Sequence, residues 1–269
     1  MRQNRKLWGI FSLSILFIVL YCIFIPRKDG VGYKYYTYGI FAILYPAILL
    51  FSVCNIRLQE LTKQEWITAI VLGISGALVA PNWAGVLSGV CTMPAYLYCV
   101  CQNRTCGRNT KIVKEHTKEY VLDDLKIILI GLVIYVVVLW FELLVQGKLQ
   151  QGIIIGVWGF RSALGAGVSE EIIFRWFLLT FLRQMNRGNE IDDVLYYVMV
   201  LIPFSLLHVI DAVVSQGVNA VVLGSLVSVL IQGLPLAILV RKRDVFTAMW
   251  LHCIFDFIKY KRQRMYFGA

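Results

Sequence analysis

The sequence predicts an all-α fold, a polytopic transmembrane helical bundle of about eight spans, within a range of seven to nine. Of its 269 residues, 59% are hydrophobic and 16% are charged, and the mean hydropathy is +0.71. Soluble domains contain about 45–50% apolar and about 25% charged residues. Polar residues are too few here to cover the surface of a soluble helical protein. The composition therefore excludes an aqueous globular domain.

Nine segments are apolar over roughly the length of a membrane-spanning helix, about 20 residues. They cover residues 7–25, 38–54, 66–80, 83–101, 125–145, 167–182, 194–213, 217–240 and 245–260. The first is longer than the apolar region of a secretory signal peptide, about 7–15 residues. Basic residues 27 and 28 follow it in place of a cleavage site of small residues. We therefore interpret it as a retained first span.

Basic residues predict how the bundle is oriented in a cell membrane. The N-terminal residues 1–6 and the loop 102–124 are both basic and are separated by four segments, so both fit the cytoplasmic side. The basic segment 259–264 also favours the cytoplasm, whereas nine spans would place it outside. We therefore expect eight spans and cytoplasmic N- and C-termini. The segments 66–80, which is short, and 167–182, which carries charges, are the weakest candidates.

The net charge of +10 would suggest nucleic-acid binding in a soluble protein. Here the basic residues lie between apolar segments, where they determine topology and contact lipid headgroups. We expect the lipid bilayer as a partner and no nucleic acid, and the sequence predicts no particular oligomeric state.

The chain contains no repeat and no linker long enough to separate soluble domains, so we expect one membrane-embedded unit. Residues 1–124 are predicted to form N-terminal transmembrane helices of unassigned role. Residues 125–269 carry the informative polar residues.

Three apolar segments of this second half each carry a pair of residues four positions apart. The pairs are Glu171 with Arg175, Phe204 with His208, and His252 with Asp256, and Glu170 adds a further carboxylate. Residues four apart share one face of a helix. Charged groups facing hydrocarbon are costly, so the three faces are expected to turn toward one another around a small polar cavity.

Three classes of function remain open at this stage. The pairs can be purely structural, since intramembrane histidines often only pack and hydrogen-bond. Carboxylate and histidine chains also serve as proton relays in transporters. A buried carboxylate next to histidines can instead activate water, and a further histidine can stabilise the oxyanion formed when a peptide carbonyl is attacked.

The ordered motifs Glu170-Glu171-x-x-x-Arg175, Phe204-x-x-x-His208 and His252-x-x-x-Asp256 resemble the CAAX protease and bacteriocin-processing family of intramembrane endopeptidases. The resemblance covers roughly residues 125–260 and includes Gly167 ahead of the glutamates. It implies a glutamic peptidase acting on a membrane-associated peptide or protein. The alternatives are a non-catalytic scaffold or bacteriocin-immunity protein and a proton-coupled transporter.

The resemblance also assigns roles. Glu170 resembles the water-activating glutamate, although either glutamate can be the base, and Glu171 and Arg175 would support it. Phe204 would pack beneath the site, His208 would hold the water, and His252 would serve the oxyanion.

Asp256 departs from the CAAX-type pattern, which has asparagine at this position, and we interpret the aspartate as favouring a bacterial member. An ionised aspartate cannot donate a hydrogen bond, so Asp256 is either protonated or orients His252. No cofactor is expected. Zinc is the alternative, because two histidines and two glutamates are acceptable ligands.

Overall fold

The computed structural model describes residues 2–24, 35–108, 111–113, 117–145, 157–187, 189 and 191–263. All regular secondary structure within these residues is helical, which confirms the predicted all-α fold. The α-helices are α1 (Arg2–Phe24), α2 (Tyr35–Asn55), α3 (Lys63–Ala77), α4 (Trp83–Thr105), α5 (Lys118–Val145), α6 (Val157–Glu170), α7 (Leu178–Met185), α8 (Asp193–Gln216), α9 (Ala220–Lys242) and α10 (Val245–Gln263). A short 3-10 helix covers Leu58–Glu60, and a π-helical segment covers Glu171–Phe177 between α6 and α7.

The nine apolar segments of the sequence coincide with nine helical rods in the described part of the chain. The segment 167–182 is the middle of one continuous rod in which α6, the π-helical segment and α7 follow one another without a break. By length and composition, five of the described helices can cross a membrane: α1, α2, α4, α8 and α9. The apolar part of α10, Val245–Ile258, is shorter.

Polar residues at the helix starts explain where several rods begin. Thr62 and Glu65 form a reciprocal capping box at the start of α3. Asn82 accepts a hydrogen bond from the backbone at the start of α4, and Asp192 and Asn219 do the same for α8 and α9. Such side chains satisfy backbone N–H groups that have no partner within the helix.

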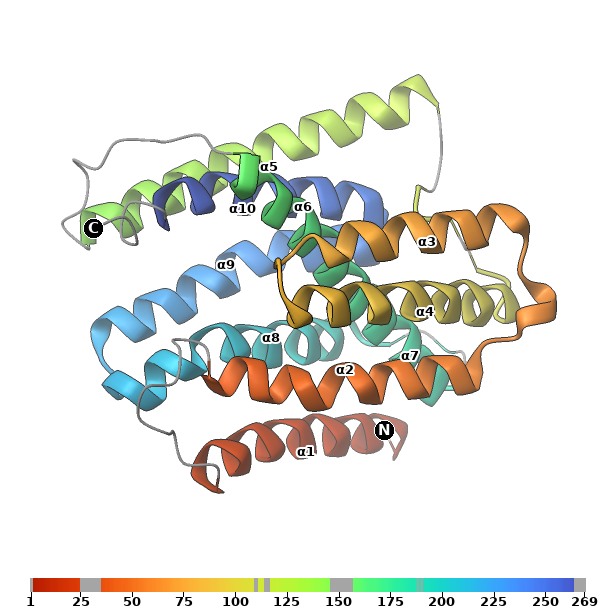
Figure 1. The fold of residues 1–269 in the computed structure, drawn as a ribbon, viewed down its shortest axis with the longest axis horizontal. Coiled ribbons are helices and arrows are strands. Elements are labelled where there is room, and N and C mark those ends of the chain that lie inside the picture. Colours follow the sequence, from red (N-terminus) through yellow and green to blue (C-terminus); the bar gives the residue numbers. More distant parts are fainter. Residues whose placement is uncertain are drawn as a thin grey trace.

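Successive rods run in alternating directions (Figure 1). The starts of α3, α5, α8 and α10 therefore meet the ends of α2, α4, α7 and α9, and contacts across this end join them. The hydroxyl of Tyr120 donates to Asp244 at 2.6 Å, and Arg241 donates to Asp193. We call this the basic end because it gathers a set of cationic residues: Arg104, Arg108, Lys111, Arg183, Arg187, Arg241, Lys242 and Arg243.

The two ends of the described chain lie at opposite ends of the bundle. α1 begins toward the basic end, and α10 ends away from it (Figure 1). The prediction that both termini lie on the same side of the membrane required one of the nine apolar segments not to cross the membrane. In the structure, the direction of the chain alternates from each rod to the next (Figure 1). The structure therefore gives no reason to keep residue 263 on the side of the basic end, and membrane sidedness itself stays a prediction.

Large apolar side chains are exposed along the outer helices. Leu13 of α1 and Leu50 of α2 are each 66% exposed, and Leu129 of α5 is 61% exposed. Exposed apolar surfaces of this extent mark contacts with a membrane or another protein. Together with the spanning lengths, they support a multi-pass membrane protein whose outer helices face lipid.

The rod formed by α6, the π-helical segment and α7 passes through the middle of the bundle (Figure 1). It is in contact with α3, α4, α8, α9 and α10. Aromatic rings of the N-terminal helices pack against it; for example, Phe51 of α2 and Tyr98 of α4 each contact Phe177. The N-terminal helices and the second half therefore share one core, which holds this central rod in place.

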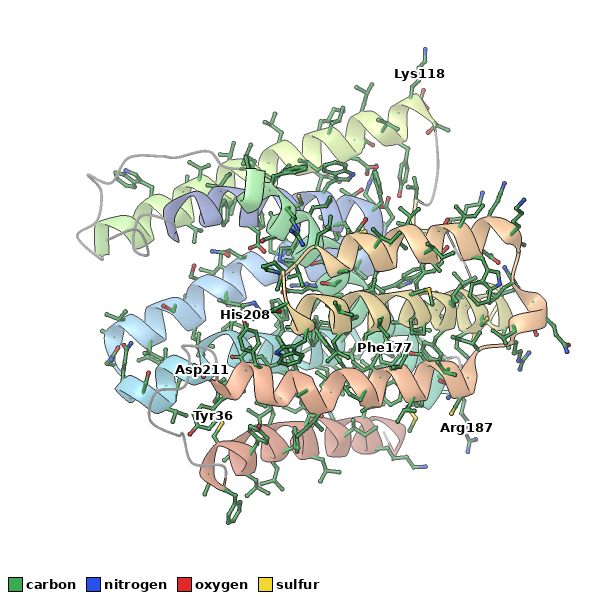
Figure 2. All side chains as sticks on the ribbon, viewed as in Figure 1. Tyr36, Lys118, Phe177, Arg187, His208 and Asp211 are labelled. Atoms are coloured by element: carbon green, nitrogen blue, oxygen red, sulfur yellow. The ribbon has the colours of Figure 1, made fainter. Side chains whose placement is uncertain are left out.

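A buried carboxylate ties α2 to α8. Asp211 of α8 accepts hydrogen bonds from the backbone of Tyr36 at 2.8 Å and of Thr37 at 3.0 Å, and from the Thr37 hydroxyl at 2.6 Å. Figure 2 shows Tyr36 and Asp211 together, with His208 one turn away on α8. The carboxylate thus caps the N-terminus of a neighbouring helix, where the helix dipole favours negative charge.

Candidate active site

Close packing between α6 and α10 brings the two glutamates next to His252. A Cβ atom added to Gly167 would lie 2.8 Å from the carbonyl oxygen of Met249 and 3.0 Å from the backbone nitrogen of Cys253. Only glycine permits this approach of the two backbones. Because Gly167 is one turn before Glu170, and Met249 and Cys253 flank His252, the contact fixes the distance between the polar residues of both helices.

The two glutamates stand where the rod changes its winding. Glu170 ends α6, and Glu171 begins the π-helical segment, which also contains Arg175. π-Helical turns inside α-helices are rare and are frequent at functional sites. The changed winding alters the directions in which neighbouring side chains leave the rod.

Glu171 is hydrogen-bonded through one of its two carboxylate oxygens, and its Oε2 atom has no partner among the described residues. Its Oε1 atom accepts from Nη1 of Arg175 at 2.5 Å and from Nδ1 of His252 at 2.6 Å. The side chains of Glu171 and Arg175 are both completely buried. This carboxylate therefore anchors His252 and has no exposed surface that a substrate can reach.

The bond from Glu171 determines how His252 presents its ring. An ionised carboxylate can only accept, so Nδ1 of His252 carries the proton. The other ring nitrogen, Nε2, lies 3.6 Å from Oε2 of Glu170 and 3.7 Å from Oδ2 of Asp256. Nε2 can donate only when the ring is protonated on both nitrogens.

His208 presents its Nε2 atom to the same place from α8. Its Nδ1 atom lies 2.9 Å from the carbonyl oxygen of Phe204, which can only accept, so Nδ1 donates this bond. Nε2 lies 4.0 Å from Oε2 of Glu170. In the neutral ring this nitrogen is an acceptor. His208 is the most accessible of these side chains, 30% exposed, compared with 16% for Glu170 and 8% for His252.

The Oε2 atom of Glu170 faces both histidines without bonding to either. It is buried and has no hydrogen-bond partner among the described residues. Buried polar atoms are nearly always hydrogen-bonded to protein or to ordered water. Gaps of 3.6 Å and 4.0 Å are too long for direct hydrogen bonds, and a water beside these atoms can contact Glu170 and a histidine at the same time.

Phe204 packs between charged and polar groups at the base of the site. Its ring lies 4.6 Å from the guanidinium carbon of Arg175 and 4.3 Å from the centre of the His208 ring. A cation over an aromatic face is attractive, and more so away from water. Phe204 therefore links the Glu171–Arg175 pair to His208.

The structure brings all seven predicted residues into this one cluster. Each of the three predicted pairs is in contact. Glu171 and Arg175 form an ion pair, the rings of Phe204 and His208 pack together, and His252 Nε2 lies 3.7 Å from Asp256 Oδ2. Three contributors were not anticipated: the π-helical winding, the approach of α10 to Gly167, and the Asp211 cap next to His208. The close approach of α10 had one signal in the sequence, the glycine at position 167, one turn before the two glutamates.

A zinc site was the alternative for this cluster. Among the side chains that the structure describes, no group of three or more histidine, cysteine, aspartate or glutamate residues is arranged to hold a metal ion. One of the two glutamates proposed as ligands, Glu171, is already bonded to Arg175 and His252. The zinc alternative gains no support from this arrangement.

Comparison with known families finds a similarity in the second half of the chain. Residues 152–258 match the family described as type II CAAX prenyl endopeptidase Rce1-like. The match covers less than half of the chain and contains all seven residues of the cluster.

The match confirms the resemblance predicted from the motifs, although it begins after the segment 125–145 that the resemblance was expected to include. No curated protein and no solved structure matches the chain.

Proposed function

We propose that this protein is an intramembrane endopeptidase that hydrolyses a peptide bond of a membrane-associated peptide or protein, with Glu170 as the base. One observation carries the proposal. Oε2 of Glu170 faces Nε2 of both His208 and His252, and the Glu170 side chain is 16% exposed, whereas Glu171 is completely buried and bonds to Arg175 and His252. Each glutamate has an Oε2 atom without a partner among the described residues, so exposure and the position beside both histidines distinguish Glu170. This arrangement supports Glu170, rather than Glu171, as the residue that contacts water.

In the proposed reaction, a single water molecule donates two hydrogen bonds, one to Glu170 and one to the acceptor Nε2 of His208. Its oxygen lone pair is then free to attack. Glu170 takes a proton from the water as the oxygen bonds to the peptide carbonyl carbon, and the carbonyl electrons move onto its oxygen. When the intermediate collapses, the C–N bond breaks and the leaving nitrogen takes the proton from Glu170. The products are a carboxylic acid and an amine.

The oxyanion is proposed to form on the side of His252 and Asp256. His252 donates to it from Nε2 in the doubly protonated state, with Nδ1 held by Glu171. Asp256 lies on the Nε2 side of the ring, and Glu171 already occupies Nδ1. We propose that Asp256 carries a proton during the reaction and is a second donor to the oxyanion.

The substrate class follows from the surroundings of the site. The cluster lies on helices that can cross a membrane or pack among such helices, so a peptide must approach within or at the bilayer. The printed family name refers to prenylated CAAX substrates. Asp256, in place of the asparagine of the CAAX-type pattern, favours a different membrane peptide. The proposed chemistry uses no metal.

The proposal is tested by quantitative membrane proteomics on cells that express the wild type or Glu170→Gln. The variant keeps the size of the side chain and removes the base. Peptides that change with the wild type alone would identify both the activity and the substrate. Glu119→Gln, an exposed carboxylate in the first turn of α5, is the matched control and should behave as the wild type. If wild type and Glu170→Gln give the same peptides at equal membrane levels, the protease proposal is wrong.

A further inference from the structure

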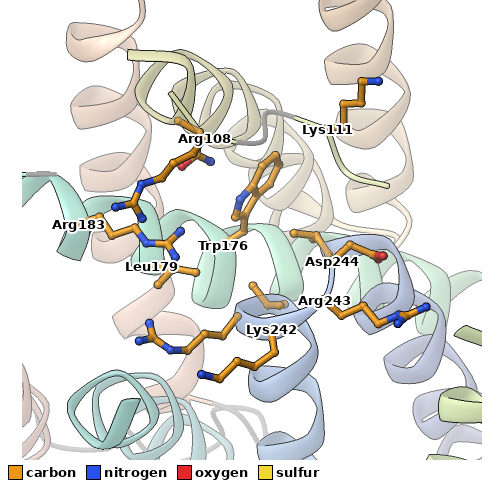
Figure 3. Close-up of a pocket in the computed structure, with 12 residues that line it drawn as sticks. Arg108, Lys111, Trp176, Leu179, Arg183, Lys242, Arg243 and Asp244 are labelled. Atoms are coloured by element: carbon orange, nitrogen blue, oxygen red, sulfur yellow. The ribbon is translucent and has the colours of Figure 1, made fainter. Parts of the chain in front are cut away.

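A second site lies at the basic end, apart from the carboxylate–histidine cluster. A cavity of about 240 Å³ opens between the end of α4, the central rod and the turn that joins α9 to α10 (Figure 3). Among the described residues, Asp244 is the one acidic side chain in its lining. The basic side chains that line it are Arg108, Lys111, Arg183, Arg241, Lys242 and Arg243.

Among the described residues, three carboxylates lie at or beside the cavity, and two of them pair with cations of its lining. Asp244 accepts from the Tyr120 hydroxyl and from the backbone of Thr247, so it caps the start of α10. Asp193 pairs with both Arg241 and Lys242, and Asp124 pairs with Arg243. The six cations of the lining still outnumber these three carboxylates, so the cavity keeps an excess of positive charge.

One of these cations is buried with a donor to spare. The side chain of Arg241 is 7% exposed; its Nε donates to Asp193 and its Nη2 to the carbonyl of Ile191. Its Nη1 has no hydrogen-bond partner among the described residues. A buried guanidinium donor without a partner is costly, and a phosphate oxygen is the acceptor that its geometry suits best.

Size and lining limit the ligand. Pockets for drug-sized molecules measure about 300–1,000 Å³, so this cavity suits a small charged group rather than a peptide. Part of its wall is apolar, formed by Trp176, Leu179, Val240 and Val245. We propose that the cavity binds the phosphate of an anionic phospholipid headgroup, with the basic side chains on the phosphate and the apolar wall against the glycerol. Basic pockets between transmembrane helices are known to take such headgroups.

The position of the cavity gives binding a structural consequence. Trp176 directly follows Arg175 in the central rod, and Val245 begins the helix that carries His252. A bound headgroup therefore holds together the rod and the helix that form the candidate active site, and it raises the thermal stability of the protein.

The test uses the full chain in nanodiscs of phosphatidylcholine with increasing phosphatidylglycerol. Thermal unfolding and native mass spectrometry measure binding without any assay of proteolysis, so the result is independent of the proposed function. Phosphatidylglycerol should raise the Tm and remain bound. The double variant Arg108→Gln/Arg183→Gln should need about tenfold more of this lipid, because charge-assisted contacts to phosphate are lost.

The matched control removes the same charge from the same end outside the cavity. Arg57→Gln/Lys63→Gln alters two exposed residues and should bind as the wild type. Lys111→Glu, also at an exposed residue, is a second variant if the arginine pair fails to fold, and it should weaken binding as well. Equal binding by the control and the cavity variants would overturn the proposal. An equal Tm rise with inorganic phosphate in phosphatidylcholine alone would overturn the assignment to a lipid.

Discussion

Glu171 and His252 are joined by a hydrogen bond of 2.6 Å between residues 81 positions apart. The bond fixes both the orientation of the ring and the position of its proton, and it leaves Nε2 facing Glu170. Partners of this kind set which nitrogen of a histidine is available for chemistry.

Replacing Glu171 with glutamine should lower kcat by about 10–100-fold, the range typical of losing an orienting partner. The amide also weakens the ion pair with Arg175, so His252 and Phe204 lose part of their common anchor. KM should change little, because the buried Glu171 does not touch substrate. A turnover assay on the purified substrate measures both constants. Wild-type kcat in this variant would remove Glu171 from the proposed mechanism.

Glu170→Ala and His208→Ala should each lower the rate by about 10²-fold or more, as expected when acid–base catalysis is lost. The two residues are proposed to hold the same water, so the double variant should be little worse than either single one. Protein levels in the membrane must be compared in parallel. If the two losses multiply in the double variant, the two residues act separately. If both single variants and the double variant keep normal activity, the scaffold or immunity alternative remains.

Much of the site was predictable from spacing alone. Residues four apart on apolar segments must share a helix face, and polar faces avoid lipid, so the three pairs were expected to meet. The nine helical segments were predictable for a similar reason, since apolar length is the dominant signal in a membrane protein.

Other features depend on packing that one sequence does not encode locally. The π-helical segment at Glu171 is a change of winding within an apolar run, with no proline or glycine inside it. Whether Glu170 or Glu171 faces the histidines depends on that winding. The Asp211 cap on Tyr36 joins residues 175 positions apart, and neither residue signals the other in the sequence.

Gly167→Ala should push α6 away from α10, because the added Cβ would meet the backbone of Met249 and Cys253. Overpacking of this kind costs about 1–3 kcal/mol. A shift of about 1 Å at a catalytic group can lower the rate by about 10²-fold. Gly224→Ala is the matched control, since nothing lies within 4 Å of its Cβ position in α9. Thermal unfolding and turnover should both fall in Gly167→Ala and not in the control; equal behaviour would mean that this approach of α6 and α10 is not needed.

The orientation of the bundle is open to cysteine labelling with a membrane-impermeant reagent. Cys106 is exposed at the basic end and should react from the cytoplasmic side, in keeping with the positive-inside rule. In a Cys54→Ser/Cys106→Ser background, Val218→Cys at the turn between α8 and α9 should react from the opposite side. A cysteine introduced at residue 263, at the end of α10, should be labelled from the same side as Val218→Cys and not from the side that labels Cys106. Labelling of residue 263 from the cytoplasm would instead favour the eight-span topology expected from charge alone.

Asp256→Asn separates the two roles open to this residue. Asp256 lies 3.7 Å from Nε2 of His252, and Nδ1 of that ring is already held by Glu171. If Asp256 is a protonated donor to the oxyanion, asparagine supplies an N–H in its place, and kcat should stay within about threefold of the wild type. Asp256→Ala removes the donor and should cost about 10²–10³-fold, the usual loss for one oxyanion contact. If Asp256→Asn is as inactive as Asp256→Ala, a negative charge is required beside His252, and the protonated form proposed here is wrong.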